Sequence, residues 1–521
     1  MSAPRFANRL IALISRFRHD KKANIAIIFT LALIPILTAV GCAIDYTLAT
    51  RMKAKLQSSA DAASVASISQ KSLGYAAAVL MTSNGSVTAG VTDANNVFNG
   101  NMSTITGYTN LSVSSTVTKT GSTLASNVAF SADVPTTFLK VLGFTSLTLT
   151  GNSKSSASLP LYLDFYLMLD VSGSMGLPST DAEQTRLAGV NPDNYVQYPS
   201  GCTLACHFDT TDTCGDGNQK YPTNNYCLGF PISRISQNGF KQLLQNYNGK
   251  LPSYRISNLP SSLYSNNPSH LSDPNLPPVS SCSTDGTDSC IQLRADAVGY
   301  AVNQLFMTAI ATQKITNQFR IGLYPFIQYL YGYFPLTTSI NGSPTNSSTI
   351  NYAAANLASQ LDTNTNSNLG SGGTHFENAF SSMNTLITSV GNGSAWNNTL
   401  PYVFLVTDGA QDSQIKGING GGWSGSNHAT VLDPTAQCKP LKDRGITISV
   451  LYIPYQPIQN PNSSFAGNED GYANSNIPNI PPSLQACASP GFFYTANTPA
   501  DITTALNTMF NHALVTAHLT N

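Results

Sequence analysis

The chain has 521 residues, a length that predicts two to four domains. Its formal net charge is zero and only 10% of its residues are charged, so no basic excess points to a nucleic-acid partner. Ser, Thr, Asn and Gly supply the polar character instead, a composition that fits an exported protein.

The first 22 residues carry a strong positive charge. Six basic residues stand there against one acidic residue, Asp20, whereas the rest of the chain holds 20 basic and 25 acidic residues. Apolar side chains recur at helical spacing among the arginines, which is typical of a segment lying on the inner leaflet of a membrane. A disordered positive flank is the alternative. We predict a cytoplasmic N-terminal segment over residues 1–22.

A transmembrane helix is predicted over residues 23–44. This run of 22 residues has no charged side chain, and at about 1.5 Å per residue it covers roughly 33 Å, enough to cross a bilayer. The basic residues on its N-terminal side favour a single pass with the N-terminus in the cytoplasm. A cleaved signal peptide and a lipoprotein signal ending at Cys42 are alternative interpretations.

Helix-forming composition continues past the span. Residues 45–71 are rich in Ala with Lys, Arg and Gln, so we expect the membrane helix to extend outward through them. Residues 72–158 are richer in Ser, Thr, Val and Gly, and Leu111–Thr118 and Ser146–Thr150 alternate in polarity like half-buried strands. A short apolar stretch, Phe138–Phe144, lies between strands. The sequence therefore predicts a small β-rich region over residues 72–158.

Residues 159–521 predict an α/β domain. Continuous apolar runs before Asp170 and before Thr407 and Asp408 suit strands buried on both faces of a parallel sheet. Strands alternate with helices beyond them, which implies a doubly wound, mainly parallel sheet. The expected strands are Phe165–Leu169, Arg320–Phe326, Tyr402–Val406, Ile446–Ile453 and Phe492–Tyr494; the expected helices are Leu293–Thr308, with Ala297, Ala301, Leu305 and Met307 on its inner side, Thr374–Val390 and Pro499–Ala513.

An irregular stretch from about 177 to 290 interrupts this domain. It is heavy in Pro, Asn, Ser and Tyr, and a loop of this length is normally functional or an inserted subdomain. Eight cysteines lie beyond the span, and this even number in an exported region predicts up to four disulfides. Six of them lie in the insertion, namely Cys202, Cys206, Cys214, Cys227, Cys282 and Cys290.

Three segments far apart in the sequence supply oxygen-bearing side chains for one divalent metal ion. Asp170, Ser172 and Ser174 follow one predicted strand, Asp408 follows another, and Thr374 follows a pair of glycines. Parallel α/β sheets bind ligands at the carboxyl ends of their strands, so both aspartates fall where a site is expected. Two carboxylates with hydroxyls, and no thiolate or imidazole, favour Mg²⁺ first and Mn²⁺ or Ca²⁺ after it.

The order Asp-x-Ser-x-Ser, then a distant Thr, then a distant Asp resembles the metal-ion-dependent adhesion site of von Willebrand factor A domains. The resemblance implies a Rossmann-like domain in which Ser172 and Ser174 contact the metal directly. Asp170 and Asp408 would act largely through water, and Thr374 would join the metal in the ligand-bound arrangement. One coordination position is then left for an Asp or Glu carboxylate of a protein partner.

The N-terminal segment resembles that of TadG-like proteins, components of the Flp/Tad pilus system of bacteria. The residues that carry this resemblance are Asn24–Phe29, Ala43–Tyr46 and Leu56–Ala63. TadG-like proteins commonly carry a von Willebrand A domain later in the chain, so the two resemblances agree. They imply an inner-membrane protein with its bulk in the periplasm or facing the surface. A prepilin is a related alternative, but the Glu expected five residues into its apolar run is absent.

The two resemblances imply a pilus assembly or adhesion component that binds a protein partner and other parts of the pilus machinery. The alternative is a surface adhesin that grips a host or abiotic target independently of pilus assembly. Because Cys438 and Cys487 lie near the late part of the A-domain pattern, we expect them to form a disulfide.

Functions outside adhesion are weaker interpretations of single motifs. A metal-dependent hydrolase needs a positioned base, and no His-Glu-x-x-His motif is present, so we do not expect an enzyme. Cys202–His207 has one residue more than a haem-attachment motif. TadG-like proteins often carry a similar Cys…Ala-Cys-His piece in this insertion, so the resemblance implies a structural disulfide. Asp209, Asp212 and Asp216 lack the spacing of a calcium-binding EF-hand, which favours a solvated loop.

Overall fold

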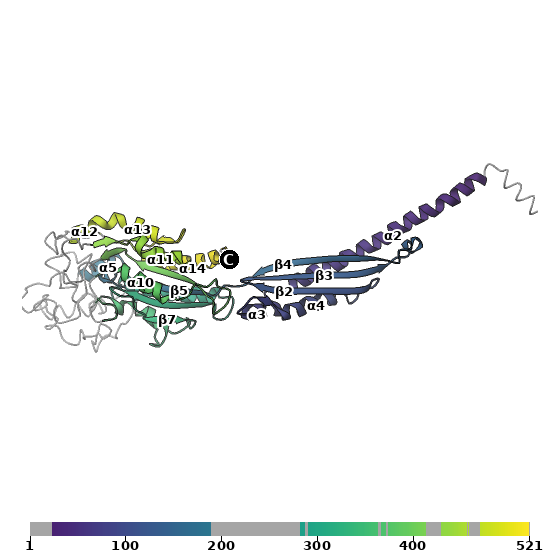
Figure 1. Cartoon of the computed structure of the whole chain (residues 1–521). Coiled ribbons are helices and arrows are strands. Elements are labelled where there is room, and N and C mark those ends of the chain that lie inside the picture. The colour runs from purple at the N-terminus through teal and green to yellow at the C-terminus, as the bar shows by residue number, and fades with distance from the viewer. Residues whose placement is uncertain are drawn as a thin grey trace, which may run out of the picture. The chain divides into compact units, whose positions relative to one another are not determined.

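The structure is a computed structural model that describes residues 23–188, 282–286, 290–362, 366–370, 373–412, 429–455, 457 and 469–519. The chain divides into two compact units, residues 1–159 and 160–521 (Figure 1). The predictions for residues 1–22, for Asp209, Asp212 and Asp216, and for Cys202, Cys206, Cys214 and Cys227 lie outside the described residues.

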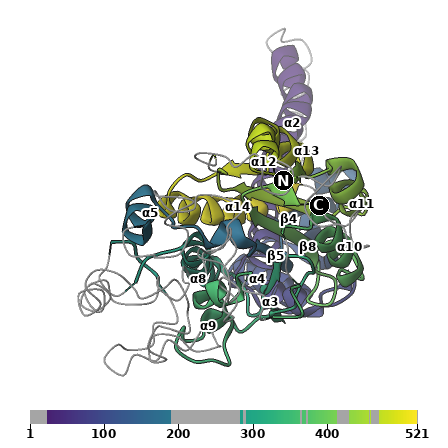
Figure 2. The same ribbon diagram turned by 90° about the vertical axis from the view of Figure 1, so that its left-hand side faces the viewer.

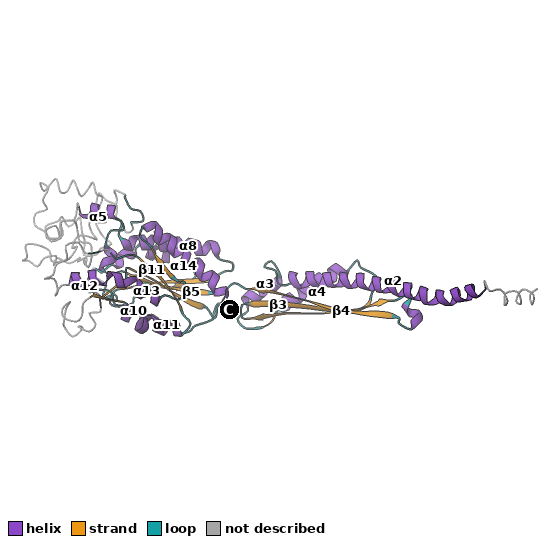
Figure 3. Ribbon diagram, turned by 90° about the horizontal axis from the view of Figure 1, so that it is seen from above, coloured by secondary structure: helices purple, strands orange, loops and turns teal. Residues whose placement is uncertain are grey.

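The first unit is built on one long helix, α2, over Ala23–Ala66. Its 44 residues continue without a break from the predicted transmembrane run through most of the predicted extension, with Pro35 inside the helix. Within the described residues, α2 is the one helix that is long and apolar enough to cross a bilayer. Its C-terminal half runs along a sheet, whereas its N-terminal half continues beyond that sheet (Figure 3).

The sheet of this unit is antiparallel, with the strand order β1-β2-β3-β4. The predicted strands at 111–118 and 146–150 are confirmed as parts of β2 and β4, and both strands are longer than expected. The bounds are Gly85–Ser86 for β1, Thr109–Thr120 for β2, Thr123–Pro135 for β3 and Ser146–Ser158 for β4.

Two helices in this region were not predicted, α3 over Leu73–Leu80 and α4 over Thr88–Met102. Helix α4 contains two Gly and four Asn, which have low helix propensity. Its helical form is stabilised by packing, because Phe98 and Met102 are buried against α2 and β3. On α2, the residues expected along one side, Leu56, Ala60 and Ala63, are fully buried in the same core.

The connection between β3 and β4, Thr136–Thr145, is docked on α2. The buried carboxylate of Asp45 accepts hydrogen bonds from the backbone N–H groups of Thr137 at 3.1 Å, Phe138 at 2.8 Å and Leu139 at 2.7 Å. The Phe138 side chain lies so close to Gly41 that a Cβ there would come within 2.5 Å of it. The 3₁₀ turn η1, Leu139–Leu142, therefore sits beside the end of the uncharged run of α2.

The second unit contains a six-stranded sheet with the order β12-β11-β8-β5-β6-β7. All neighbouring strands are parallel except β7, which is antiparallel to β6, so the sheet is mixed. The bounds are Leu163–Asp170 for β5, Phe319–Phe326 for β6, Phe334–Thr337 for β7, Leu400–Thr407 for β8, Thr447–Tyr452 for β11 and Phe493–Thr495 for β12. A separate antiparallel pair consists of β9, Ala410–Asp412, and β10, Ala429–Val431.

Helices lie on both faces of this sheet, with α8 and α14 on one side and α10 and α11 on the other (Figures 2 and 3). Alternate residues of β5 enter the two cores, because side chains of a strand point to opposite faces; Phe165 belongs to one core and Met168 to the other. The helices are α5 (Asp181–Ala188), α8 (Arg294–Thr312), α9 (Ile350–Ala355), α10 (Phe376–Leu386), α11 (Lys439–Asp443), α12 (Glu469–Asn476), α13 (Ile480–Cys487) and α14 (Pro499–Leu519).

The prediction for one side chain of α8 was wrong. Ala297, Ala301 and Leu305 are buried as expected, but Met307 is 62% exposed. The buried series advances by four residues and continues at Ala309, because residues four apart lie on the same side of a helix. Met307, two residues after Leu305, falls on the opposite side.

Two disulfides join described cysteines. The predicted Cys438–Cys487 bond is confirmed and joins the start of α11 to the end of α13. The other, Cys282–Cys290, lies at the end of the predicted insertion. Part of that insertion is regular, since α5 begins at Asp181. Its Glu183 is fully buried and accepts hydrogen bonds from the N–H groups of Gly286 and Gln292.

We expect Asp45→Ala to release the β3–β4 connection from α2, because three backbone N–H groups lose their acceptor. Hydrogen-exchange mass spectrometry of the full chain in detergent should show faster exchange over residues 136–145. Asp61→Ala, which removes an exposed carboxylate from the same helix, is the matched control. Equal exchange in the two variants would show that Asp45 does not hold the connection.

Candidate metal centre

The carboxyl ends of β5 and β8 bring two aspartates into one site. These strands are parallel neighbours in register, with Leu169 opposite Val406. Asp170 ends β5, and Asp408 follows the last residue of β8, Thr407. The Thr407 hydroxyl donates a hydrogen bond of 2.6 Å to Asp170 Oδ2, so the two strand ends are joined directly.

The turn after β5 supplies the two serine hydroxyls. The Ser172 N–H donates to Asp170 Oδ1 at 3.0 Å, which holds the chain in a tight turn. A 3₁₀ turn, η2, follows over Gly173–Gly176. Ser172 Oγ and Ser174 Oγ lie 3.3 Å apart, and both side chains are buried. Two hydroxyl oxygens and the Asp170 carboxylate are therefore held by five consecutive residues, 170–174.

Asp408 stands on a turn that requires the following glycine. Gly409 has a φ of +80°, and a Cβ at this position would come within 2.4 Å of Ile480. Its N–H donates to the Thr407 hydroxyl at 2.9 Å, the same hydroxyl that donates to Asp170. This turn directs the Asp408 carboxylate into the protein, where the residue is fully buried.

The Asp408 carboxylate lacks ordinary partners. Among the described residues, neither of its oxygens has a hydrogen-bond partner. The nearest cation is the buried Arg294, whose Nη1 lies 3.6 Å from Asp408 Oδ2 and is itself without a hydrogen bond in the described part of the chain. A buried carboxylate in this state is costly, because desolvation is not repaid by donors at hydrogen-bond distance.

The electrostatics of the site reflect this burial. Burial, together with the nearby Asp170 carboxylate, raises the pKa of Asp408 to about 7. Arg294 opposes that rise, as do the Ser174 hydroxyl and the Ala410 N–H, although neither donor stands at full hydrogen-bonding geometry toward Asp408. Burial also raises the pKa of Asp170, against the opposing hydrogen bonds from Thr407 and Ser172. The site thus holds more buried negative charge than Arg294 neutralises.

Thr374 lies near this end of the sheet but makes no hydrogen bond to the other four predicted residues among those described. It is buried and follows Gly373, which has a φ of +111°. The next N–H, of His375, donates to the Ile327 carbonyl just beyond β6. His375 and Glu377 begin α10, as expected, with the His375 Nδ1 atom 2.9 Å from Glu377 Oε1.

Two contributors were not assigned a role from the sequence. Thr407 was visible only as the residue before Asp408, and its hydroxyl bridges the two strand ends. Arg294 had no local signal, because it starts a helix more than a hundred residues from either aspartate. Within the described residues, no group of three or more His, Cys, Asp or Glu is placed to hold a metal, so any cation here would also depend on hydroxyl oxygens.

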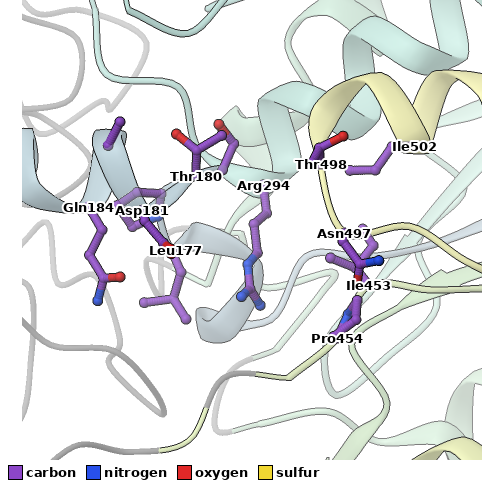
Figure 4. Close-up of a pocket in the computed structure, with 13 residues that line it drawn as sticks. Leu177, Thr180, Asp181, Gln184, Arg294, Ile453, Pro454, Asn497, Thr498 and Ile502 are labelled. Atoms are coloured by element: carbon purple, nitrogen blue, oxygen red, sulfur yellow. The ribbon is translucent and has the colours of Figure 1, made fainter.

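A cavity of about 370 Å³ adjoins the site (Figure 4). It is bounded by the segment after η2, the loop after β11 and the start of α14, and Arg294 lines it. Its walls include Leu177, Asp181, Ile453, Asn497 and Thr498. Arg294 therefore lies between this cavity and the Asp408 carboxylate.

Several solved structures are similar to this chain. The pilus adhesin SpaC from Lactobacillus rhamnosus GG is 11% identical over 78% of this chain and 34% of its own, with a TM-score of 0.32. The PilB minor pilin from Streptococcus sanguinis is 11% identical over 78% of this chain and 77% of its own, with a TM-score of 0.31. The von Willebrand factor domain of the Mfa5 pili tip protein from Porphyromonas gingivalis is 12% identical over 43% of this chain and 89% of its own, with a TM-score of 0.26.

This chain spans about a third of the length of SpaC. No match was found among curated proteins.

A family model described as "Putative Flp pilus-assembly TadE/G-like" matches residues 23–71. These are the residues of α2 and the turn that follows it. The match covers the three stretches that carried the resemblance in the sequence, Asn24–Phe29, Ala43–Tyr46 and Leu56–Ala63. The N-terminal segment of this chain is thus confirmed as similar to TadE/G-like pilus-assembly proteins.

Proposed function

We propose that this protein is a membrane-anchored component of a Tad pilus system. Its second unit would act as a von Willebrand A-like domain that binds a protein partner through a divalent metal ion. The observation that carries this proposal is the pair of buried carboxylates, Asp170 and Asp408, of which Asp408 has no hydrogen-bond partner among the described residues.

The residues present fit a hard divalent cation. Asp170, Asp408, Ser172 and Ser174 offer oxygen atoms at one end of the sheet, and Mg²⁺ prefers oxygen ligands. Thr374 is the fifth proposed ligand, and it would approach from the loop before α10. The metal ion, Mg²⁺ or else Mn²⁺ or Ca²⁺, would supply positive charge that the buried carboxylates lack and a position for an Asp or Glu side chain of the partner.

The proposed location follows from α2. Its uncharged run is preceded by six basic residues, which favours a cytoplasmic N-terminus. The rest of the chain would then lie on the periplasmic or outer side of the inner membrane. The match of residues 23–71 to a pilus-assembly model supports an association with pilus machinery.

We propose a binding role and not an enzymatic one. The carboxylate and hydroxyl oxygens of the site would bind the cation. The His375 imidazole is paired with Glu377 at the start of α10. The adjoining cavity, lined by Arg294, would accept polar groups of a partner next to the metal. An adhesin that acts independently of the pilus would use the same chemistry, so a cellular test has to distinguish the two roles.

Asp408→Asn should abolish the stabilisation of the protein by Mg²⁺. Ligand that binds only the folded state at 100 times its Kd adds about 2.7 kcal/mol to the free energy of unfolding, a shift of several degrees in Tm. In chelator the Tm of the variant should differ little from that of the parent, because the repulsion from Asp170 that it relieves offsets the pair with Arg294 that it breaks. Differential scanning calorimetry of the full chain measures both.

Asp443→Asn is the control for this measurement, since Asp443 is an exposed carboxylate that pairs with Lys439. It should keep the full Mg²⁺ response. An Asp408→Asn protein that still gains stability from Mg²⁺ would contradict the assignment of this carboxylate to the metal.

Arg294→Met should strengthen the Mg²⁺ response while weakening the metal-free protein. Removing one partner of a buried charge pair costs about 3–5 kcal/mol, so Tm in chelator should fall. Mg²⁺ would then bind without a guanidinium 3.6 Å from Asp408, so the shift it produces should grow. Calorimetric titration with Mg²⁺ checks the affinity directly.

Arg320→Met is the matched control, because Arg320 pairs with Asp164 at the opposite end of β5. It should lower stability without changing the Mg²⁺ affinity. An unchanged affinity in Arg294→Met would show that its charge does not act on the metal position.

The biological role is tested in cells whose own copy carries Asp170→Ala. Surface pili are counted by electron microscopy and attachment is scored on the same cells, at matched protein level. We expect loss of pili, because the metal site is proposed to hold an assembly partner. Normal pili with failed attachment would instead favour the independent adhesin, and normal behaviour in both assays would remove the proposed role of the site.

A further inference from the structure

We propose that the β3–β4 connection, Thr136–Thr145, is a second membrane contact that enters the outer interface of the bilayer beside α2. This inference rests on the proposed membrane anchoring by α2. It assigns a role to the apolar stretch Phe138–Phe144, which the metal site does not use.

The connection exposes large apolar side chains. Phe138 is 42%, Val141 81%, Leu142 54% and Phe144 57% exposed. These four side chains lie within seven consecutive residues, whereas the strands on either side alternate regularly. Contiguous exposed apolar surface marks a site of contact with a protein or a membrane.

The position of the connection favours the membrane. It is held at Gly41 and Asp45, where the uncharged run of α2 ends. The helix surface there is also apolar and exposed, at Val40 and Ile44. The apolar side chains of the connection therefore continue the surface of the proposed span, so that the bilayer which covers one also reaches the other.

Polar side chains at the same level suit the interface. Lys140 is exposed within the connection, and Tyr46 is exposed one residue beyond Asp45. Tyr is enriched where membrane helices leave the hydrocarbon region, and a Lys side chain extends its charge toward lipid head groups. A soluble protein partner does not explain why this patch lies at the end of the span.

The backbone of the connection is already hydrogen-bonded internally, which lowers the cost of leaving water. Besides the three N–H groups that donate to Asp45, the N–H of Val141 donates to Phe138 O, that of Gly143 to Lys140 O and that of Phe144 to Leu139 O. The N–H of Thr136 donates to the Thr145 carbonyl across the base of the connection.

The test places a tryptophan at three exposed positions of the full chain in liposomes that contain lipids brominated on their acyl chains. Leu37→Trp reports on the proposed span, Val141→Trp on the connection, and Val65→Trp on a distant part of α2. Val65 lies 21 residues beyond Ile44, about 31 Å along the helix. The emission of the parent protein, with Trp396 and Trp423, is the background to subtract.

We expect the added emission of Leu37→Trp and Val141→Trp to be largely lost in brominated lipid, and that of Val65→Trp to be unchanged. Quenching of Leu37→Trp without quenching of Val141→Trp would overturn this inference and leave the anchoring intact. A blue-shifted but unquenched Val141→Trp would assign the patch to another protein molecule, which also overturns it. An unquenched Leu37→Trp would refute the membrane anchoring itself, and this inference with it.

Discussion

The burial of two carboxylates at adjacent strand ends is the constraint on which the second unit depends. Asp170 and Asp408 are close because β5 and β8 are parallel neighbours in register. Like charges held together in a dry environment each raise the pKa of the other, and one guanidinium at 3.6 Å does not compensate both. The sheet around them is apolar and closely packed, so the packing of its two cores has to offset the unfavourable free energy of burying these carboxylates.

Local backbone features maintain the site against this cost. The Thr407 hydroxyl joins the two strand ends by accepting from Gly409 and donating to Asp170. Gly409 permits a turn that a side chain would block. A site that keeps buried carboxylates without sufficient partners is typical of function and not of stability, because a stable core would replace them. The proposed metal ion would bind these carboxylates and neutralise their charge.

In the first unit, one helix, α2, contributes both to a folded core and to the proposed membrane span. The C-terminal half of α2 buries apolar side chains, Leu56, Ala60 and Ala63, against the sheet, whereas its N-terminal half exposes large apolar ones. Asp45 lies between the two halves and fixes the β3–β4 connection to the helix. One continuous helix can therefore belong to a folded domain and to a proposed membrane span at the same time, because the change is in what its surface contacts.

Much of this protein was determined by sequence alone. The uncharged run of α2, the apolar strands of the second unit, the Cys438–Cys487 bond and the likeness of residues 23–71 to pilus-assembly proteins all follow from local composition or from motifs. Periodicity and motif order are properties of neighbouring residues, so they are readable without a structure. The tertiary structure alone decided that α4 is a helix, since packing overrides its weak propensity. It also decided that Arg294 faces Asp408 and that the β3–β4 connection packs on Gly41. Contacts between residues far apart in sequence produce no recognisable pattern in the sequence of either segment.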